Sequence, residues 1–207
     1  MTLNLPTPGA PETTSLAECI RRRRSTREYA ESPIPLSCLS ELLWSAQGIT
    51  GDEGKRASPS AGGRYPLHLH VLVRSVDGLP PGLYAYGVDD HSLQRMDDLP
   101  SDAVVEEMGI GDQPWLRDAA VMIGVAADLA GTIEHFEDQP PAGERGPRYV
   151  YMETGALAQN VQLYATALEL GCVLVAGFED GLTRSALRFS SNLAPCALLC
   201  IGYRPST

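Results

Sequence analysis

The chain has 207 residues, of which 43% are hydrophobic and 20% are charged, as is usual for a globular protein with one sizeable core. Its formal net charge of −10 argues against nucleic acid or an anionic membrane as the main partner, because binding to polyanions depends on positive charge. No apolar run approaches the roughly 20 residues that a membrane-spanning helix needs, so we expect no membrane association.

The chain is expected to begin with an extended arm over residues 1–14, followed by a single domain over residues 15–207. The first twelve residues are polar and rich in proline, and they lack the charged and apolar regions of a signal peptide. We therefore expect a cytoplasmic protein.

A helix is predicted over residues 15–24, because Ser15 can cap it and Glu18 stands three residues later, as in a capping box. The helix leads into five arginines within residues 21–27, next to Ser25 and a threonine. Guanidinium groups bind phosphate oxygens in pairs, and a hydroxyl adds a short hydrogen bond. The cluster predicts a site for one small phosphorylated molecule, with a solvated, charged helix end as the alternative.

A second helix is predicted from a cap at Ser37 to Gly48, followed by a polar, glycine-rich loop over residues 50–63. Residues 67–73 alternate like a strand with one buried face.

Four further elements are predicted between residues 82 and 127. Residues 82–86 and 92–96 are predicted to form a hairpin, and residues 101–108 a short helix. Residues 119–127 form a nearly continuous apolar run, which indicates a central strand that is covered on both faces.

Residues 128–147 contain three prolines and no sustained period, so we interpret them as a lid or substrate loop. A long helix is predicted over 148–170, with Gly171 ending it. Apolar residues surround most of this helix, which favours burial against a second subunit as well as its own sheet. Strands are then predicted over 172–176 and 194–203, with a turn into a last helix between them.

The sequence contains no phosphate-binding P-loop, no complete dinucleotide fingerprint and no zinc-protease motif. Its four histidines and five cysteines lack metal-ligand spacing, so no metal site is expected. Because few reactive side chains stand out, the chemistry is expected to be that of a cofactor.

Five segments carry a recognisable pattern along nearly the whole chain: residues 23–29, 58–66, 153–160, 175–179 and 201–204. Together they resemble the nitroreductase family of flavoproteins, specifically its SagB-type branch. The resemblance implies an α+β fold in which helices flank a mostly antiparallel central sheet. It also implies a homodimer with a long central helix and one FMN at each end of the subunit interface.

The resemblance implies a set of cofactor-binding residues: Arg23, Arg24, Ser25, Arg27, Pro59, Ser60, Ala61, Gly62, Gly177 and Arg204. The FMN phosphate and ribityl chain would be held by Arg23, Arg24, Ser25, Arg27 and Arg204. Arg21 and Arg22 would be solvated helix charges. Three residues would reach the flavin from the other subunit: Pro59, Ser60 and Ala61. Gly177 would lie near flavin N5, where a Cβ would crowd the ring.

The implied activity is that of an FMN-dependent oxidoreductase, which takes electrons from NADH or NADPH and passes hydride through flavin N5 to a nitro, quinone or similar small acceptor. The SagB-type branch also contains dehydrogenases that oxidise thiazolines and oxazolines with a lysine and a tyrosine before the long helix. Glu144 and Arg145 stand in their places here, which leaves Tyr149 and Tyr151 as weak candidates for the base. The remaining alternatives are a non-catalytic flavin-binding or storage protein and a related fold that binds another anion.

Overall fold

The computed structural model describes residues 2–9 and 14–205. A seven-stranded sheet has the order β1-β4-β3-β2-β5-β7-β6, and every neighbouring pair is antiparallel. The strands are β1 (Thr2–Asn4), β2 (Leu67–Val73), β3 (Gly82–Gly87), β4 (Ser92–Asp97), β5 (Val121–Ala127), β6 (Leu170–Val175) and β7 (Ala194–Tyr203). The helices are α1 (Leu16–Arg22), α2 (Leu36–Gln47), α3 (Asp102–Met108), α4 (Trp115–Asp118), α5 (Leu129–His135), α6 (Arg145–Ala167) and α7 (Asp180–Ala186).

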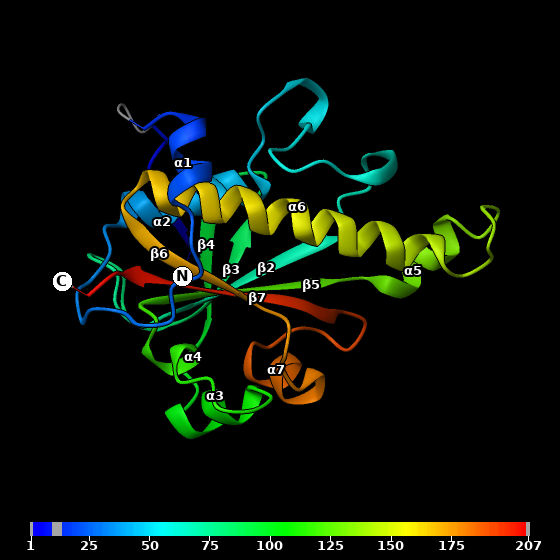
Figure 1. Ribbon diagram of the computed structural model, residues 1–207. Coiled ribbons are helices and arrows are strands. Elements are labelled where there is room, and N and C mark those ends of the chain that lie inside the picture. Colours follow the sequence, from blue (N-terminus) through cyan, green and yellow to red (C-terminus); the bar gives the residue numbers. More distant parts are fainter. Residues whose placement is uncertain (1, 10–13, 206–207) are drawn as a thin grey trace.

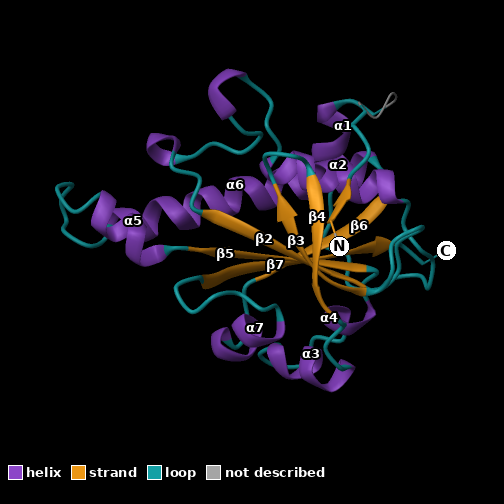
Figure 2. Ribbon diagram, turned by 180° about the vertical axis from the view of Figure 1, so that it is seen from behind, coloured by secondary structure: helices purple, strands orange, loops and turns teal. Residues whose placement is uncertain are grey.

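Helices cover both faces of the sheet. Figures 1 and 2 show α1, α2 and α6 on one face and α3, α4 and α7 on the other. Every residue of β5 is buried, as expected for a central strand between two helical layers. The α+β fold with an antiparallel sheet flanked by helices is therefore confirmed. Among the described residues, no helix combines the length and the apolar character needed to cross a membrane.

The longest helix, α6, buries a stripe that includes Val150, Leu157 and Val161 against α2 and the sheet. Tyr151 and Met152 lie outside this stripe and are 58% and 68% exposed. One chain thus leaves α6 exposed around Tyr151 and Met152, and burial of this part against a second subunit stays a prediction.

The predicted start of α1 is confirmed, whereas that of α2 is not. Ser15 accepts the N–H of Glu18 at 3.2 Å and caps α1, which confirms the predicted start of that helix. The predicted cap of α2 at Ser37 is wrong, because the helix already begins at Leu36. The carbonyl of Pro35 accepts the N–H of Leu39 at 3.2 Å and closes the first turn earlier in the chain.

The predicted bounds of the long helix are also wrong at both ends. It begins at Arg145 and ends at Ala167, and the chain reverses at Glu169, which has a left-handed φ of 59°. Gly171 therefore lies in β6 and does not end the helix. A Cβ on Gly171 would come within 2.5 Å of Cγ2 of Thr26, so the missing side chain lets the arginine segment lie against the strand.

The predicted loop over residues 128–147 is partly helical, because Asp128 accepts the N–H of Gly131 at 3.0 Å and caps α5. This helix was not predicted, because seven residues are too few to show a sustained apolar period. A role as a lid stays a prediction. In the predicted N-terminal arm, Thr2–Asn4 pairs with β4 as strand β1, while residues 1 and 10–13 lie outside the described part of the chain.

Candidate active site

The arginine segment is attached to one edge of the sheet. Ser25 forms a bridge to Cys172 of the edge strand β6, and the N–H of Thr26 donates to the Cys172 carbonyl at 3.1 Å. Further along, the N–H of Ala30 donates to the carbonyl of Tyr203 at 2.9 Å. Residues 25–30 are therefore held against the ends of β6 and β7 by backbone hydrogen bonds.

The arginines near this edge fall into two groups by their partners. Arg21 pairs with Glu18, and Arg22 pairs with both Glu18 and Glu169. The hydrogen bond from Arg22 lowers the pKa of Glu169, with smaller effects from the charges of Arg22 and Arg204. No carboxylate of the described residues lies within salt-bridge distance of the guanidinium groups of Arg23, Arg24, Arg27 or Arg204.

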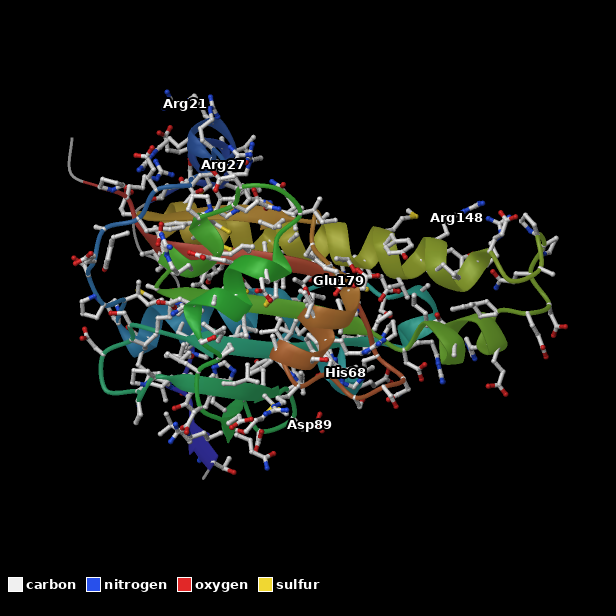
Figure 3. All side chains as sticks on the ribbon, turned by 90° about the horizontal axis from the view of Figure 1, so that it is seen from below. Arg21, Arg27, His68, Asp89, Arg148 and Glu179 are labelled. Atoms are coloured by element: carbon white, nitrogen blue, oxygen red, sulfur yellow. The ribbon has the colours of Figure 1, made fainter. Side chains whose placement is uncertain are left out.

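Three of these arginines, Arg23, Arg24 and Arg27, contact neutral groups. Arg23 donates to Oε1 of Gln162 on α6 at 3.0 Å, and the guanidinium carbon of Arg27 lies 5.3 Å from the centre of the Trp115 ring. Figure 3 shows Arg21 and Arg27 at one end of the molecule, far from Arg148 near the start of α6. Because these charges are not neutralised within the described chain, the donor set fits a phosphate group.

Gly177 follows the other end of β6. Its carbonyl oxygen accepts from the side-chain amide of Gln113 at 2.6 Å and from the N–H of Ile110 at 2.9 Å. A Cβ built on Gly177 would meet only the Gln113 amide nitrogen, at 3.6 Å. The space before this glycine is thus open within the described chain, and a flat ring could approach its backbone closely.

A pocket of about 380 Å³ lies between α6 and the turn formed by residues 59–62. Its lining residues are Pro59, Ser60, Ala61, Tyr149, Met152, Glu153 and Ala156. Gly62 follows them with a left-handed φ of 60°, a conformation that favours glycine. Three of the four predicted residues of this turn therefore line one cavity.

The buried side chain of Glu153 connects the turn to α6. Oε1 of Glu153 accepts the N–H of Ala61 at 2.7 Å. Burial raises the pKa of Glu153, while hydrogen bonds from the Ala61 N–H and the Ser60 hydroxyl lower it by less. The turn itself is closed by the N–H of Tyr65, which donates to Oγ of Ser60 at 2.8 Å.

The arginine segment and the turn contact opposite sides of α6. Arg23 reaches α6 at Gln162, whereas Ala61 reaches it at Glu153. Nine positions at about 100° each place these two helix residues half a turn apart, with an axial separation of about 13.5 Å. One chain therefore presents the two groups of predicted binding residues as separate half-sites.

The two candidate tyrosines differ in position. Tyr149 lines the pocket and donates its hydroxyl hydrogen to Oε1 of Gln139 at 2.8 Å, whereas Tyr151 is not part of the lining. Glu144 forms an ion pair with Arg148, and Arg145 donates to the carbonyl of Pro140 at 2.7 Å. Neither residue at the lysine and tyrosine positions of the dehydrogenases lines the pocket.

Four further residues hold the site: Gln113, Glu153, Asn160 and Gln162. Glu153 and Asn160 lie in the recognised segment 153–160, but no role was predicted for any of the four. Glu153 did carry a signal, because it lies three positions after Val150 and four before Leu157 on the buried stripe of α6. A charged residue on such a stripe needs a partner. The sequence around Gln113 contained no such signal, since the contact of Gln113 with Gly177 joins distant parts of the chain.

Comparisons with known proteins show the family and the fold of the chain. The family model described as the nitroreductase family matches residues 20–203. A protein of Methanocaldococcus jannaschii named "Putative nitroreductase MJ1384" is 37% identical over 195 residues, which cover 93% of each chain. The match therefore spans almost all of both proteins.

Solved structures show the same fold. The crystal structure of a "putative nitroreductase" from Ralstonia eutropha JMP134 is 26% identical with a TM-score of 0.80, covering 100% of this chain and 90% of that one. A chain of the E. coli microcin synthetase McbBCD complex has a TM-score of 0.71 over 99% of this chain and 78% of that one, and its 18% identity shows a common fold alone. The chain therefore belongs to the nitroreductase family, and the expectation of an FMN-dependent oxidoreductase is confirmed at the level of that family.

Proposed function

We propose that two copies of this chain bind FMN at their interface and use it to reduce a small acceptor at the expense of NADH or NADPH. The observation that carries the proposal is a group of arginines without carboxylate partners. They lie beside Ser25, which forms a bridge to the edge strand β6. Arg23, Arg24 and Arg27 would bind the phosphate and ribityl chain, with Arg204 as a further donor.

The remaining binding residues have roles that follow from their positions. When bound, FMN supplies hydride transfer through N5 between the nicotinamide and the acceptor. Gly177 would bring its backbone against the N5 edge, where an N–H favours electron density on the ring. The open space before Gly177 supports this role. Hydride transfer requires stacking and short distances, so these residues act by positioning.

The two half-sites on opposite sides of α6 support a site that is shared between subunits. In the proposed dimer, one subunit supplies the arginine segment and Gly177, and its partner supplies Pro59, Ser60, Ala61 and Gly62. The exposed Met152 lies beside this turn and would face the other subunit.

The pocket beside the turn supports a small acceptor. Pro59, Met152 and Ala156 give it apolar surface, and Tyr149 adds an aromatic ring with a polar end. Such a lining suits a flat molecule with few charges, such as a nitroaromatic compound or a quinone. Residues 128–147 include the neighbouring α5 and would cover the acceptor as the proposed lid.

The absorption spectrum of the purified protein tests this proposal, before and after anaerobic addition of NADH or NADPH. We expect a yellow protein whose flavin band is bleached by one of the two and restored by a nitroaromatic compound or a quinone. A yellow protein that neither donor bleaches would favour the non-catalytic or dehydrogenase alternatives. A colourless protein that takes up no FMN would exclude the flavin proposals and favour another anion.

A second candidate function is oxidation of a thiazoline or oxazoline ring, as in SagB-type dehydrogenases. The place of Tyr149 in the pocket lining favours it, because its hydroxyl could take the ring proton. A chain of the E. coli microcin synthetase McbBCD complex, which was solved with truncated pro-MccB17 bound, has the same fold. Anaerobic bleaching of the FMN-loaded protein by a thiazoline-containing peptide, and its loss in Tyr149→Phe, would support this function over the first.

A further inference from the structure

Helix α6 holds the segment before the pocket at two points on one face. The amide of Asn160 donates to Oγ of Ser58 at 3.2 Å and to the carbonyl of Ala57 at 3.3 Å. Glu153 accepts the N–H of Ala61 at 2.7 Å. Seven positions separate these two helix residues, which places them on the same face, two turns apart. The segment therefore lies along α6 and is held by three hydrogen bonds, two to Asn160 and one to Glu153.

The two holding points differ in what they fix. Ser58 is fully buried and also donates to the carbonyl of Ala46 at 2.6 Å, so the first point has several supports. The second point leads into Gly62 and Gly63, which have left-handed φ values of 60° and 64°. Two glycines in succession leave a backbone with many accessible conformations. The acceptor on Glu153 restricts the residue that directly precedes them.

Burial of a glutamate at this place is costly unless its oxygens are hydrogen-bonded. Glu153 is 7% exposed, and it lies between the fully buried Val150 and Leu157 on α6. A neutral residue would fill the stripe without that cost. The hydrogen bond to Ala61 is the contact that a carboxylate makes here and an apolar side chain cannot make.

We propose that Glu153 is a positioning residue, whose carboxylate holds the turn of residues 59–62 in the shape that contacts the flavin of the partner subunit. That the turn contacts FMN rests on the proposed function. The hydrogen bond that holds the turn belongs to the single chain and does not depend on FMN. Glu153 acts through Ala61 and Ser60, without touching the cofactor.

The test compares two substitutions of similar size. Glu153→Gln keeps a carbonyl oxygen for the Ala61 N–H, whereas Glu153→Leu fills the volume and removes the acceptor. Glu107→Gln and Glu107→Leu are matched controls, because Glu107 is an exposed glutamate of α3. Circular dichroism and thermal unfolding establish that each variant is folded.

The first measurement is amide hydrogen exchange of residues 57–65 in the protein without flavin. We expect exchange at Ala61 to be about tenfold faster in Glu153→Leu and within about threefold of wild type in Glu153→Gln, because the leucine leaves the N–H without an acceptor. The second measurement is the dissociation constant of FMN from flavin fluorescence. It should rise about tenfold in Glu153→Leu and recover in Glu153→Gln.

A second route removes the donor and leaves α6 unchanged. Ala61→Pro deletes the N–H, and the extended Ser60 (φ −141°, ψ 136°) suits a residue that precedes proline. We expect Ala61→Pro and Glu153→Leu each to weaken FMN binding. If Glu153 acts through this hydrogen bond, combining the two substitutions should cause no further loss beyond that of the more weakly binding single variant. If Glu153→Leu is poorly folded, Ala61→Pro alone tests the hydrogen bond, and unchanged FMN binding in that variant would overturn the positioning role.

The outcomes separate the two proposals. If wild type binds FMN and Glu153→Leu shows unchanged exchange and an unchanged dissociation constant, the positioning role is overturned while the proposed function stands. Additive losses in the double variant would also overturn it. If wild type takes up no FMN, the proposed function fails, and hydrogen exchange alone shows whether Glu153 fixes the turn.

Discussion

The side-chain amide of Gln113 donates to the carbonyl oxygen of Gly177 at 2.6 Å and also donates to the carbonyl of Ile110 at 2.9 Å. The contact with Gly177 joins the segment before α4 to the end of β6 and fixes the plane of the peptide that follows Gly177, while the contact with Ile110 holds the Gln113 side chain within its own segment. In the proposed site, this glycine lies against the N5 edge of the flavin. The position of its backbone therefore depends on a side chain more than sixty residues away in sequence.

We expect Gln113→Ala to shift the midpoint potential of bound FMN by roughly 20 mV, because one hydrogen bond of about 1 kcal/mol no longer fixes the Gly177 backbone. Reductive titration with a reference dye measures this potential. The control is Gln94→Ala, at an exposed position of β4. Equal potentials in all three proteins would show that Gln113 does not influence the flavin.

The two groups of arginines should differ in their effect on FMN binding. Arg27→Ala should weaken binding about tenfold to a hundredfold, since it removes charged hydrogen bonds to a phosphate. Arg21→Ala should change the dissociation constant by less than about twofold, because Arg21 is exposed and paired with Glu18. Fluorescence titration of the flavin-free protein measures both, and equal losses would contradict the assignment.

The exposed side of α6 should carry the subunit contact. Met152→Glu places a charge on a methionine that is 68% exposed in one chain, and we expect at least a tenfold weaker dimer if a partner covers it. The matched control is Met96→Glu on β4, where the methionine is 41% exposed. Sedimentation velocity over a concentration series measures the dissociation constants. A wild-type monomer at all concentrations would contradict the shared site.

His70 should make the protein sensitive to acid. Burial lowers its pKa below 6.5, with a partly opposing effect from the hydrogen bond to the Leu187 carbonyl and a further lowering by His68. The unfolded chain therefore binds this proton at a higher pH than the folded chain. The contribution to stability is complete above about pH 6.5 and is lost as the pH falls below it.

Urea unfolding between pH 8 and pH 5 checks this expectation. We expect the free energy of unfolding of wild type to fall across that range and the slope to be smaller in His70→Gln. His70 also stacks on Phe189 at a ring distance of 4.2 Å, so the variant is expected to be less stable at every pH. Identical slopes in the two proteins would rule out His70 as a source of the acid sensitivity.

Elements with strong local signals could be predicted from the sequence. The cap at Ser15, the alternation of β2 and the apolar run of β5 each depend on neighbouring residues alone, and all three were located correctly. The fold class and the family followed from the order of five short segments. A resemblance of that kind depends on patterns that single residues do not carry.

Features that depend on contacts between distant residues could not be predicted. The local pattern predicts a helix end at Gly171, whereas in the structure its missing side chain makes room for Thr26 from the arginine segment. The hydrogen bond from Ala61 to Glu153 spans 92 positions in the sequence. Such contacts exist only after the sheet has brought the segments together, so no local pattern could reveal them.

The position of the half-sites on opposite sides of α6 has a consequence for mixtures of damaged subunits. In the proposed dimer, a chain with Arg27→Ala still supplies an intact turn, and a chain with Glu153→Leu still supplies intact arginines. When the two are mixed and exchange subunits, each hybrid dimer contains one site with both defects and one site with neither. Two chains that bind FMN poorly would restore each other's binding, as independent sites within single chains could not.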